Sequence, residues 1–113
     1  MAEFGQDFTI WRGEDRTLEF LVPGQAGAVL AYWYLAANRF KATGNADLAL
    51  SVGNGITLED SGDDLLVKVT VTKTQSASLP LGLRHHELWL NDTSGQDRLV
   101  AEGRATINDS VRA

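Results

Sequence analysis

The sequence predicts an all-β fold, an antiparallel sandwich of about seven to eight short strands with one short helical turn near residues 75–78. Three observations support this prediction. Apolar residues alternate with polar ones over several short segments, as expected for strands with one buried face. The segments are rich in β-branched and aromatic residues, and evenly spaced turn formers (Gly, Pro, Asn and Asp) separate them.

The clearest pattern lies in the stretch LLVKVTVTKTQSASLPLGLRHHELWL, residues 65–90. Alternating β-branched residues predict one strand that runs from Leu65 to Thr72. In a second strand, Leu88 and Leu90 share a face with His86. Other strands are expected at 8–11, 17–22, 48–52, 56–58 and 98–107. The first two of these predict a hairpin or an adjacent corner at the edge of the fold.

Thr74 and Pro80 mark the limits of the predicted helical turn. Threonine is a favoured N-cap residue, so Thr74 is the candidate cap for a turn over 75–78. Proline lacks the backbone N–H that a helix needs, so Pro80 stops the turn.

Segment 28–41 fits two interpretations. As a strand, it places Trp33 and Leu35 on one face and Tyr32 and Tyr34 on the other. As a helix, it gives an apolar stripe at i, i+3 and i+4 spacing, supported by four alanines. Its aromatic content and the strand patterns on either side favour the strand.

The last strand carries small residues on its apolar side. Leu99, Ala101 and Gly103 are expected on one face. Small residues leave room for a large neighbour, and Trp33 and Trp89 are the candidates to pack over them.

Length and composition indicate one globular domain, residues 1–113, with an N-terminal arm at 1–7 and a polar C-terminal tail at 108–113. The chain has a formal charge of -5, which disfavours nucleic acid as a partner because phosphate is repelled. It has no cysteine, and no apolar run approaches the length of a membrane span. We therefore expect no disulfide, no nucleic-acid partner and no membrane partner, and synthesis in a cytoplasm.

Two groups of titratable residues are candidates for metal binding. His85 and His86 are adjacent, and adjacent strand residues point to opposite faces, so we expect one at the rim of the core and one on the surface. The acidic turn at 59–64 lacks the spacing of an EF-hand loop, so we expect solvated carboxylates. No nucleophile elbow or phosphate loop is present. The sequence therefore predicts a protein that is not an enzyme, with no catalytic residue, metal or cofactor.

The aromatic residues are more numerous than one small core requires. Trp and Tyr dominate hot spots between proteins, so the excess predicts a protein interface. The alternative is that Trp33 fills the core and the tyrosines only cover a sheet. The candidate interface residues are Phe4, Phe8, Trp11, Tyr32, Tyr34 and Trp89.

A series of short motifs runs through most of the chain. They are WRGED at 11–15, GNGI at 53–56, DSG at 60–62, LVKVT at 66–70, the segment 74–82 ending in LPLG, HEL at 86–88, a turn at Gly95 and Gly103 in the last strand. This series resembles the small immunoglobulin-like proteins of tailed bacteriophages. It is similar to the N-terminal domain of baseplate upper proteins, which anchors receptor-binding machinery to the tail. The chain departs from the family at His85-His86, where an aromatic residue is common.

The resemblance implies an immunoglobulin-like sandwich that acts as a structural protein of the virion. Its expected place is the tail, the baseplate or the attachment of a tail fibre. Its expected partners are other virion proteins, in a homo-oligomer or multi-copy assembly. We expect no receptor-binding or coiled-coil extension beyond Ala113, so a capsid decoration protein is an alternative. A second class is a carbohydrate-binding module in which Trp11, Trp33 or Trp89 stacks on sugars.

Overall fold

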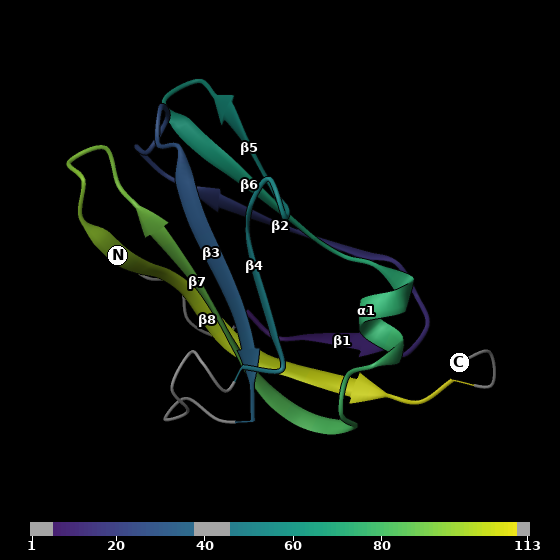
Figure 1. Ribbon diagram of the computed structural model, residues 1–113. Coiled ribbons are helices and arrows are strands. Elements are labelled where there is room, and N and C mark those ends of the chain that lie inside the picture. Colours follow the sequence, from purple (N-terminus) through teal and green to yellow (C-terminus); the bar gives the residue numbers. More distant parts are fainter. Residues whose placement is uncertain (1–5, 38–45, 111–113) are drawn as a thin grey trace.

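In a computed structural model, residues 6–37 and 46–110 are described, and they form eight strands and one short helix (Figure 1). The strands are β1 (Phe8–Trp11), β2 (Arg16–Val22), β3 (Leu30–Ala36), β4 (Leu48–Val52), β5 (Gly55–Ser61), β6 (Asp64–Val71), β7 (Gly82–Asn91) and β8 (Asp97–Asn108), and the helix is α1 (Lys73–Ala77). The predicted all-β class is confirmed. Segment 28–41 forms a strand from residue 30 to 36, and residues 38–41 lie outside the described part of the chain.

All eight strands belong to one sheet in the order β1-β8-β7-β3-β4-β5-β6-β2. Five of the seven pairings are antiparallel, but β1 pairs with β8 and β4 with β5 in parallel. The sheet is therefore mixed, whereas the sequence predicted an antiparallel arrangement. Of the two alternatives for the first two strands, the hairpin is wrong, because β1 and β2 do not pair and lie at opposite ends of the strand order. The adjacent corner at the edge of the fold agrees with the contact between these strands.

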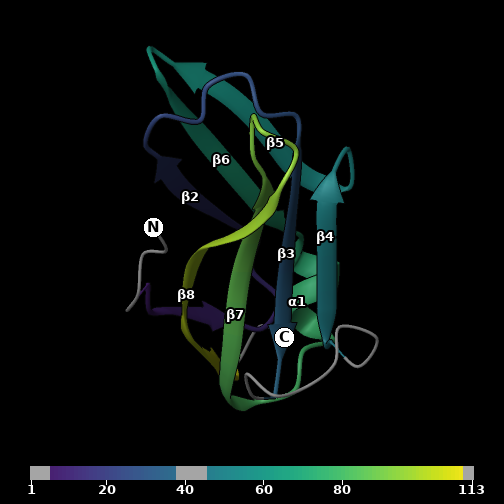
Figure 2. The same ribbon diagram turned by 90° about the vertical axis from the view of Figure 1, so that its left-hand side faces the viewer.

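The sheet is narrowest between β4 and β5, where only two residue pairs join the strands. On one side of this junction lie β5, β6 and β2, and on the other lie β4, β3, β7, β8 and β1 (Figures 1 and 2). The sheet curls so that its two end strands approach each other. The Arg16 guanidinium at the start of β2 donates a hydrogen bond to the Thr9 carbonyl of β1, 3.0 Å away.

The hydrophobic core lies inside this curl. Side chains from the strands on both sides of the narrow junction fill it. Alternate residues of each strand face inward because strand side chains alternate between the two faces. Trp33 and Leu35 of β3 are fully buried, as are Val67 and Val69 of β6. The interpretation of Trp33 as a residue that fills the core therefore agrees with the structure.

A β-bulge changes which residues of β8 face the core. The register between β7 and β8 shifts after Leu88, so Leu88 lies opposite Ala101 while Trp89 lies opposite Leu99. Val100 and Ala101 are consequently both buried. The expectation that Leu99 shares the inner face of Ala101 is wrong, because the extra residue reverses the alternation.

The helix α1 begins two residues earlier than the sequence indicated. Thr72 is the N-cap: its hydroxyl accepts from the Gln75 backbone N–H, and the Gln75 side chain accepts from the Thr72 N–H. This reciprocal pair is a capping box, which explains why Thr72 and not Thr74 begins the helix. The chain crosses from β6 to β7 through this helix, so the two strands of residues 65–90 do not pair with each other.

Candidate functional site

The outward face of β3 and β7 carries three aromatic side chains. The register places Tyr32 opposite Trp89 and Tyr34 opposite Glu87. Residues opposite each other on neighbouring strands project from the same face of a sheet. We call Tyr32, Tyr34 and Trp89 the outer aromatic surface; all three are partly exposed.

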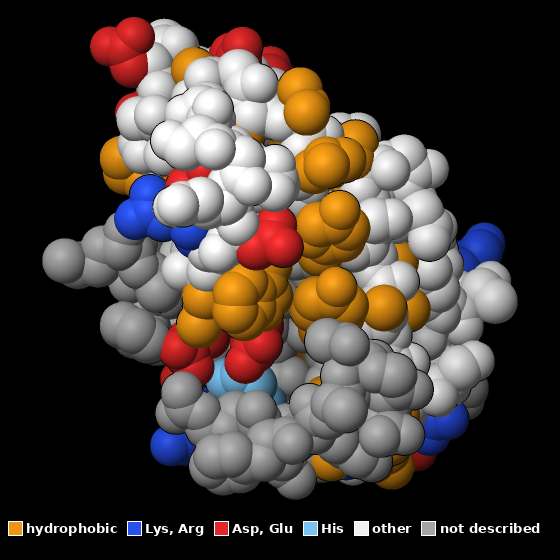
Figure 3. Space-filling view, turned by 60° about the vertical axis from the view of Figure 1, so that its left-hand side comes forward, with side chains coloured by type: hydrophobic (Ala, Val, Ile, Leu, Met, Phe, Trp, Pro, Cys, Tyr) orange, Lys and Arg blue, Asp and Glu red, His pale blue; other side chains and the backbone are white. Residues whose placement is uncertain are grey.

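A hollow of about 360 Å³ lies on the outer aromatic surface, and Glu87 and Asp97 complete its lining. Figure 3 shows a side of the molecule on which hydrophobic side chains, a class that includes Tyr and Trp, gather beside acidic ones. Aromatic faces bind flat or cationic groups, and carboxylates accept hydrogen bonds. The arrangement is suited to binding a ligand group by stacking and by hydrogen bonding.

Glu87 fixes the position of the Trp89 ring. Its Oε1 accepts a hydrogen bond from the Trp89 Nε1–H at 2.9 Å, and its Oε2 lies 3.0 Å from His85 Nε2. His85 Nε2 also lies 3.8 Å from Oε1 of Glu102, a carboxylate that is largely buried. A ring that is already held in place loses less side-chain entropy when a partner binds.

The Tyr34 hydroxyl remains protonated at neutral pH. Burial raises the pKa of Tyr34, and the neighbouring Tyr32 and Asp97 raise it further. The hydroxyl therefore remains available both as a donor and as an acceptor at the edge of the hollow.

The other predicted interface residues lie elsewhere. Trp11 is 49% exposed, but it pairs with Asn108 near the end of β8, whereas Trp89 pairs with Leu99 near its start. Phe8 packs against the core, with its ring 4.6 Å from that of His86. Phe4 lies outside the described residues. The structure thus brings together Tyr32, Tyr34 and Trp89 but neither Phe8 nor Trp11.

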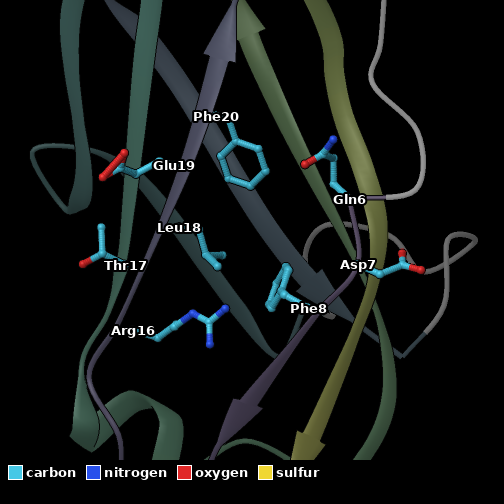
Figure 4. Close-up of a pocket in the computed structure, with 8 residues that line it drawn as sticks. All are labelled: Gln6, Asp7, Phe8, Arg16, Thr17, Leu18, Glu19 and Phe20. Atoms are coloured by element: carbon cyan, nitrogen blue, oxygen red, sulfur yellow. The ribbon is translucent and has the colours of Figure 1, made fainter.

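A second hollow, of about 210 Å³, lies between the two end strands of the sheet. We call it the edge groove; its lining residues are Gln6, Asp7, Phe8, Arg16, Thr17, Leu18, Glu19 and Phe20. In Figure 4, Phe8 of β1 lies near Leu18 and Phe20 of β2 in the middle of the view. Among the described residues, β1 and β2 each pair with a neighbouring strand on one side only.

His86 lies in the core beneath the edge groove and is fully buried. Its Nδ1 accepts a hydrogen bond from the Trp33 Nε1–H at 3.3 Å, and its Nε2 contacts the Gln6 carbonyl oxygen. Its ring also lies near those of Phe8 and Phe20. Burial lowers the pKa of His86, partly offset by the hydrogen bond to the Gln6 backbone. The prediction of a histidine at the core rim is therefore corrected, because this histidine lies within the core.

The two candidate metal groups have other roles in the structure. His85 and His86 project from opposite faces of β7, as the strand pattern predicted. In the acidic turn, Asp60 and Asp64 accept hydrogen bonds from the backbone N–H groups of Gly27 and Gly24. Within residues 6–37 and 46–110, no group of three or more His, Asp or Glu side chains is placed to hold a metal ion.

Comparison with known proteins does not assign the chain to a family. No protein-family profile matches it, and no curated protein matches it at a significant level. In the described part of the chain, no helix has the length and apolar character needed to cross a membrane.

Sequence reasoning missed Glu87 and Asp97 as parts of the aromatic hollow. Glu87 shares a strand face with Trp89, and this period-two relationship was visible in the sequence. Asp97 is brought to the same place by the pairing of β8 with β7, where it lies opposite Asn91. That contact depends on strand register, which no local pattern in the sequence specified.

Proposed function

We propose that this protein is a non-enzymatic structural protein of a bacteriophage virion, in the tail, the baseplate or the attachment of a tail fibre. It acts by docking to other virion proteins. The observation that carries the proposal is the outer aromatic surface, where Tyr32, Tyr34 and Trp89 surround a hollow on a regular sheet. Trp and Tyr residues that are partly exposed and already fixed in position are characteristic of the anchor residues in protein interfaces.

The strand order supports an immunoglobulin-like sandwich as the framework of this protein. On one side of the narrow junction, β2, β6 and β5 follow the order of the B, E and D strands of that fold. On the other side, β8, β7, β3 and β4 follow the order of the G, F, C and C′ strands. This agreement adds to the resemblance of the sequence motifs to the immunoglobulin-like phage proteins.

The ends of the sheet support a multi-copy assembly. In the described residues, β1 and β2 each have one side without a strand partner. An unpaired strand edge offers backbone N–H and C=O groups to a neighbouring chain, which completes the sheet by adding a strand. Repeated contacts of this kind would stabilise a small domain by mass action.

Mass spectrometry of purified particles of the phage that encodes the chain tests the proposal. The expected result is the presence of the chain at many copies per particle, in the tail fraction after heads and tails are separated. Recovery with heads alone would support the alternative of a capsid decoration protein. Absence of the chain from the particles would overturn the proposal.

A carbohydrate-binding module is the second candidate, because three aromatic rings and two carboxylates line the same hollow. Sugar rings stack on aromatic faces, and carboxylates accept hydrogen bonds from sugar hydroxyls. Trp33 does not contribute to such a platform because it is fully buried. Retention on a polysaccharide column that is lost in Trp89→Ala and kept in Trp11→Ala would favour this class.

A further inference from the structure

The hollow on the outer aromatic surface has more hydrogen-bond acceptors than free donors. Carboxylates of Glu87 and Asp97 accept and cannot donate when ionised. The one indole N–H in the lining, that of Trp89, already donates to Glu87. In the part of the lining that the structure describes, only the hydroxyls of Tyr32 and Tyr34 remain as side-chain donors. A ligand that supplies hydrogen-bond donors fits this lining better than a ligand that also needs donors from the protein.

The hollow is also negatively charged. Of the described residues that line it, two carry carboxylates and none is Lys or Arg. Asp97 is exposed, and one of its oxygens, Oδ1, accepts from the Asn91 side chain. The whole chain carries a formal charge of -5, so its long-range field also favours a positively charged partner.

We propose that this hollow binds the guanidinium group of an arginine side chain on a partner protein. A guanidinium has five N–H donors and no acceptor, which is complementary to an acceptor-rich lining. It is planar and stacks on aromatic faces, so the rings of Trp89 and the tyrosines can hold it while Asp97 accepts its hydrogen bonds. A lysine ammonium lacks the planar surface. A sugar hydroxyl also accepts hydrogen bonds, and for these the described lining offers only the two tyrosine hydroxyls as side-chain donors.

This inference depends on the proposed function only in taking the partner to be another virion protein. The binding chemistry itself follows from the lining of the hollow. The two proposals therefore have separate tests.

The first test is an NMR titration of the complete chain with N-acetyl-arginine methylamide. The matched probe is N-acetyl-citrulline methylamide, which has a similar shape but no charge. The three tryptophans give three indole N–H signals, which Trp11→Phe and Trp89→Phe assign. We expect the arginine probe to shift the Trp89 signal and the citrulline probe to leave it in place. The signal of buried Trp33 should not move in either titration.

Two Asp→Asn variants test which carboxylate contributes to binding of the arginine probe. Asp97→Asn should weaken binding of the arginine probe about five-fold, since a charge-assisted hydrogen bond becomes a neutral one. Asp63→Asn is the matched control: it makes the same charge change at another exposed position and should leave the affinity unchanged. Added salt should weaken binding in the wild type because the site is open to solvent.

Equal shifts with the arginine and citrulline probes, or equal affinities of Asp97→Asn and the wild type, would overturn the inference. A shift of the Trp89 signal with maltotriose in place of the arginine probe would also overturn it and favour a sugar ligand. If arginine fails to bind while Trp89→Ala prevents incorporation into particles, the arginine proposal falls and the docking function stands. If arginine binds but the chain is absent from particles, the arginine proposal stands and the virion function falls.

Discussion

The Trp33 Nε1–H donates a hydrogen bond to Nδ1 of His86, 3.3 Å away, inside the core. Because Nδ1 accepts, the ring proton of neutral His86 lies on Nε2, which faces the Gln6 carbonyl oxygen. Protonation of the ring would place an Nδ1–H against the indole N–H of Trp33. The core therefore holds this histidine in its neutral form, and the same ring connects the core to the segment that precedes β1.

Stability should fall at acidic pH because His86 must remain neutral in the folded protein. Burial lowers the pKa of His86 from the ordinary value of 6.5, so the unfolded chain binds a proton more readily. The free energy of unfolding should therefore begin to decrease near pH 6.5 and decrease further until the pH reaches the lowered pKa. Urea denaturation between pH 8 and pH 5 measures this dependence.

Comparison of two glutamine variants isolates the contribution of His86 to the pH dependence of stability. His86→Gln should be less stable than the wild type at pH 8 but should lose less stability on acidification. Leu83→Gln changes an exposed, uncharged residue of the same strand and should retain the pH dependence of the wild type. Identical pH profiles for His86→Gln and the wild type would contradict the prediction.

Gly103 provides space for the segment before β1. A Cβ atom added at Gly103 would lie 2.5 Å from the Gln6 carbonyl oxygen, closer than such atoms approach. Gly103→Ala should therefore displace this segment and reduce the free energy of unfolding by about 2 kcal/mol, as overpacking does. The Gln6 amide, which donates to the Glu102 carbonyl, should exchange its hydrogen faster in the variant.

The neighbouring substitution Arg104→Ala serves as the control for Gly103→Ala. Arg104 is exposed, so its side chain can be shortened without displacing the segment before β1. Its backbone N–H, which donates to Asp7, is retained. Unchanged stability and unchanged Gln6 exchange in Gly103→Ala would show that the segment is not held at this position.

Ser76 and Ser78 form a matched pair in and after α1. Ser76 is fully buried; its hydroxyl donates to the Glu14 carbonyl at 2.7 Å and accepts from the Gly13 N–H at 3.0 Å. Ser76→Ala removes the partner of these two partly buried backbone groups and should cost about 2 kcal/mol of stability. Ser78 is exposed and bonds only within its own turn, so Ser78→Ala should have little effect. Thermal denaturation of both variants measures the difference, and equal losses would contradict it.

Trp89 and Trp11 distinguish the two aromatic regions of the surface. Trp89→Ala should weaken docking to a virion partner by about 2 kcal/mol, the loss typical of an interface anchor. Trp11→Ala removes an exposed tryptophan of β1, which lies beside the end of β8, and should leave docking intact. Competition between the variants and the wild type for incorporation into particles gives the comparison. Stronger exclusion of Trp11→Ala would place the interface at β1.

Local patterns in the sequence predicted most strands, but they did not predict how the strands pair. Alternation identified β1 and β6 almost to the residue, since it depends only on which side chains face the core. The partner of β1 is β8, about 100 positions away, and no turn signal encodes such a distant pairing. The hairpin was predicted because β1 and β2 are adjacent in the chain. In the structure, the two strands lie at opposite ends of the strand order.

The candidate site was predicted only in part for the same reason. Alternation assigns Tyr32 and Tyr34 to one face, and the excess of aromatic residues over what one small core requires makes Trp89 a candidate. Their meeting on one surface depends on the register of β3 with β7. Phe8 has the same aromatic character, but it packs inward because β1 presents it to the core.

The parallel pairing of the first and last strands has a mechanical consequence. In β1 and β8 the four residue pairs from Phe8–Ala105 to Trp11–Asn108 run in the same direction. Tension applied between the beginning of β1 and the end of β8 would load the backbone hydrogen bonds of this ladder together, in shear, and would not open them one by one. The domain should resist extension along this axis, so it could carry force between whatever is attached at its two ends.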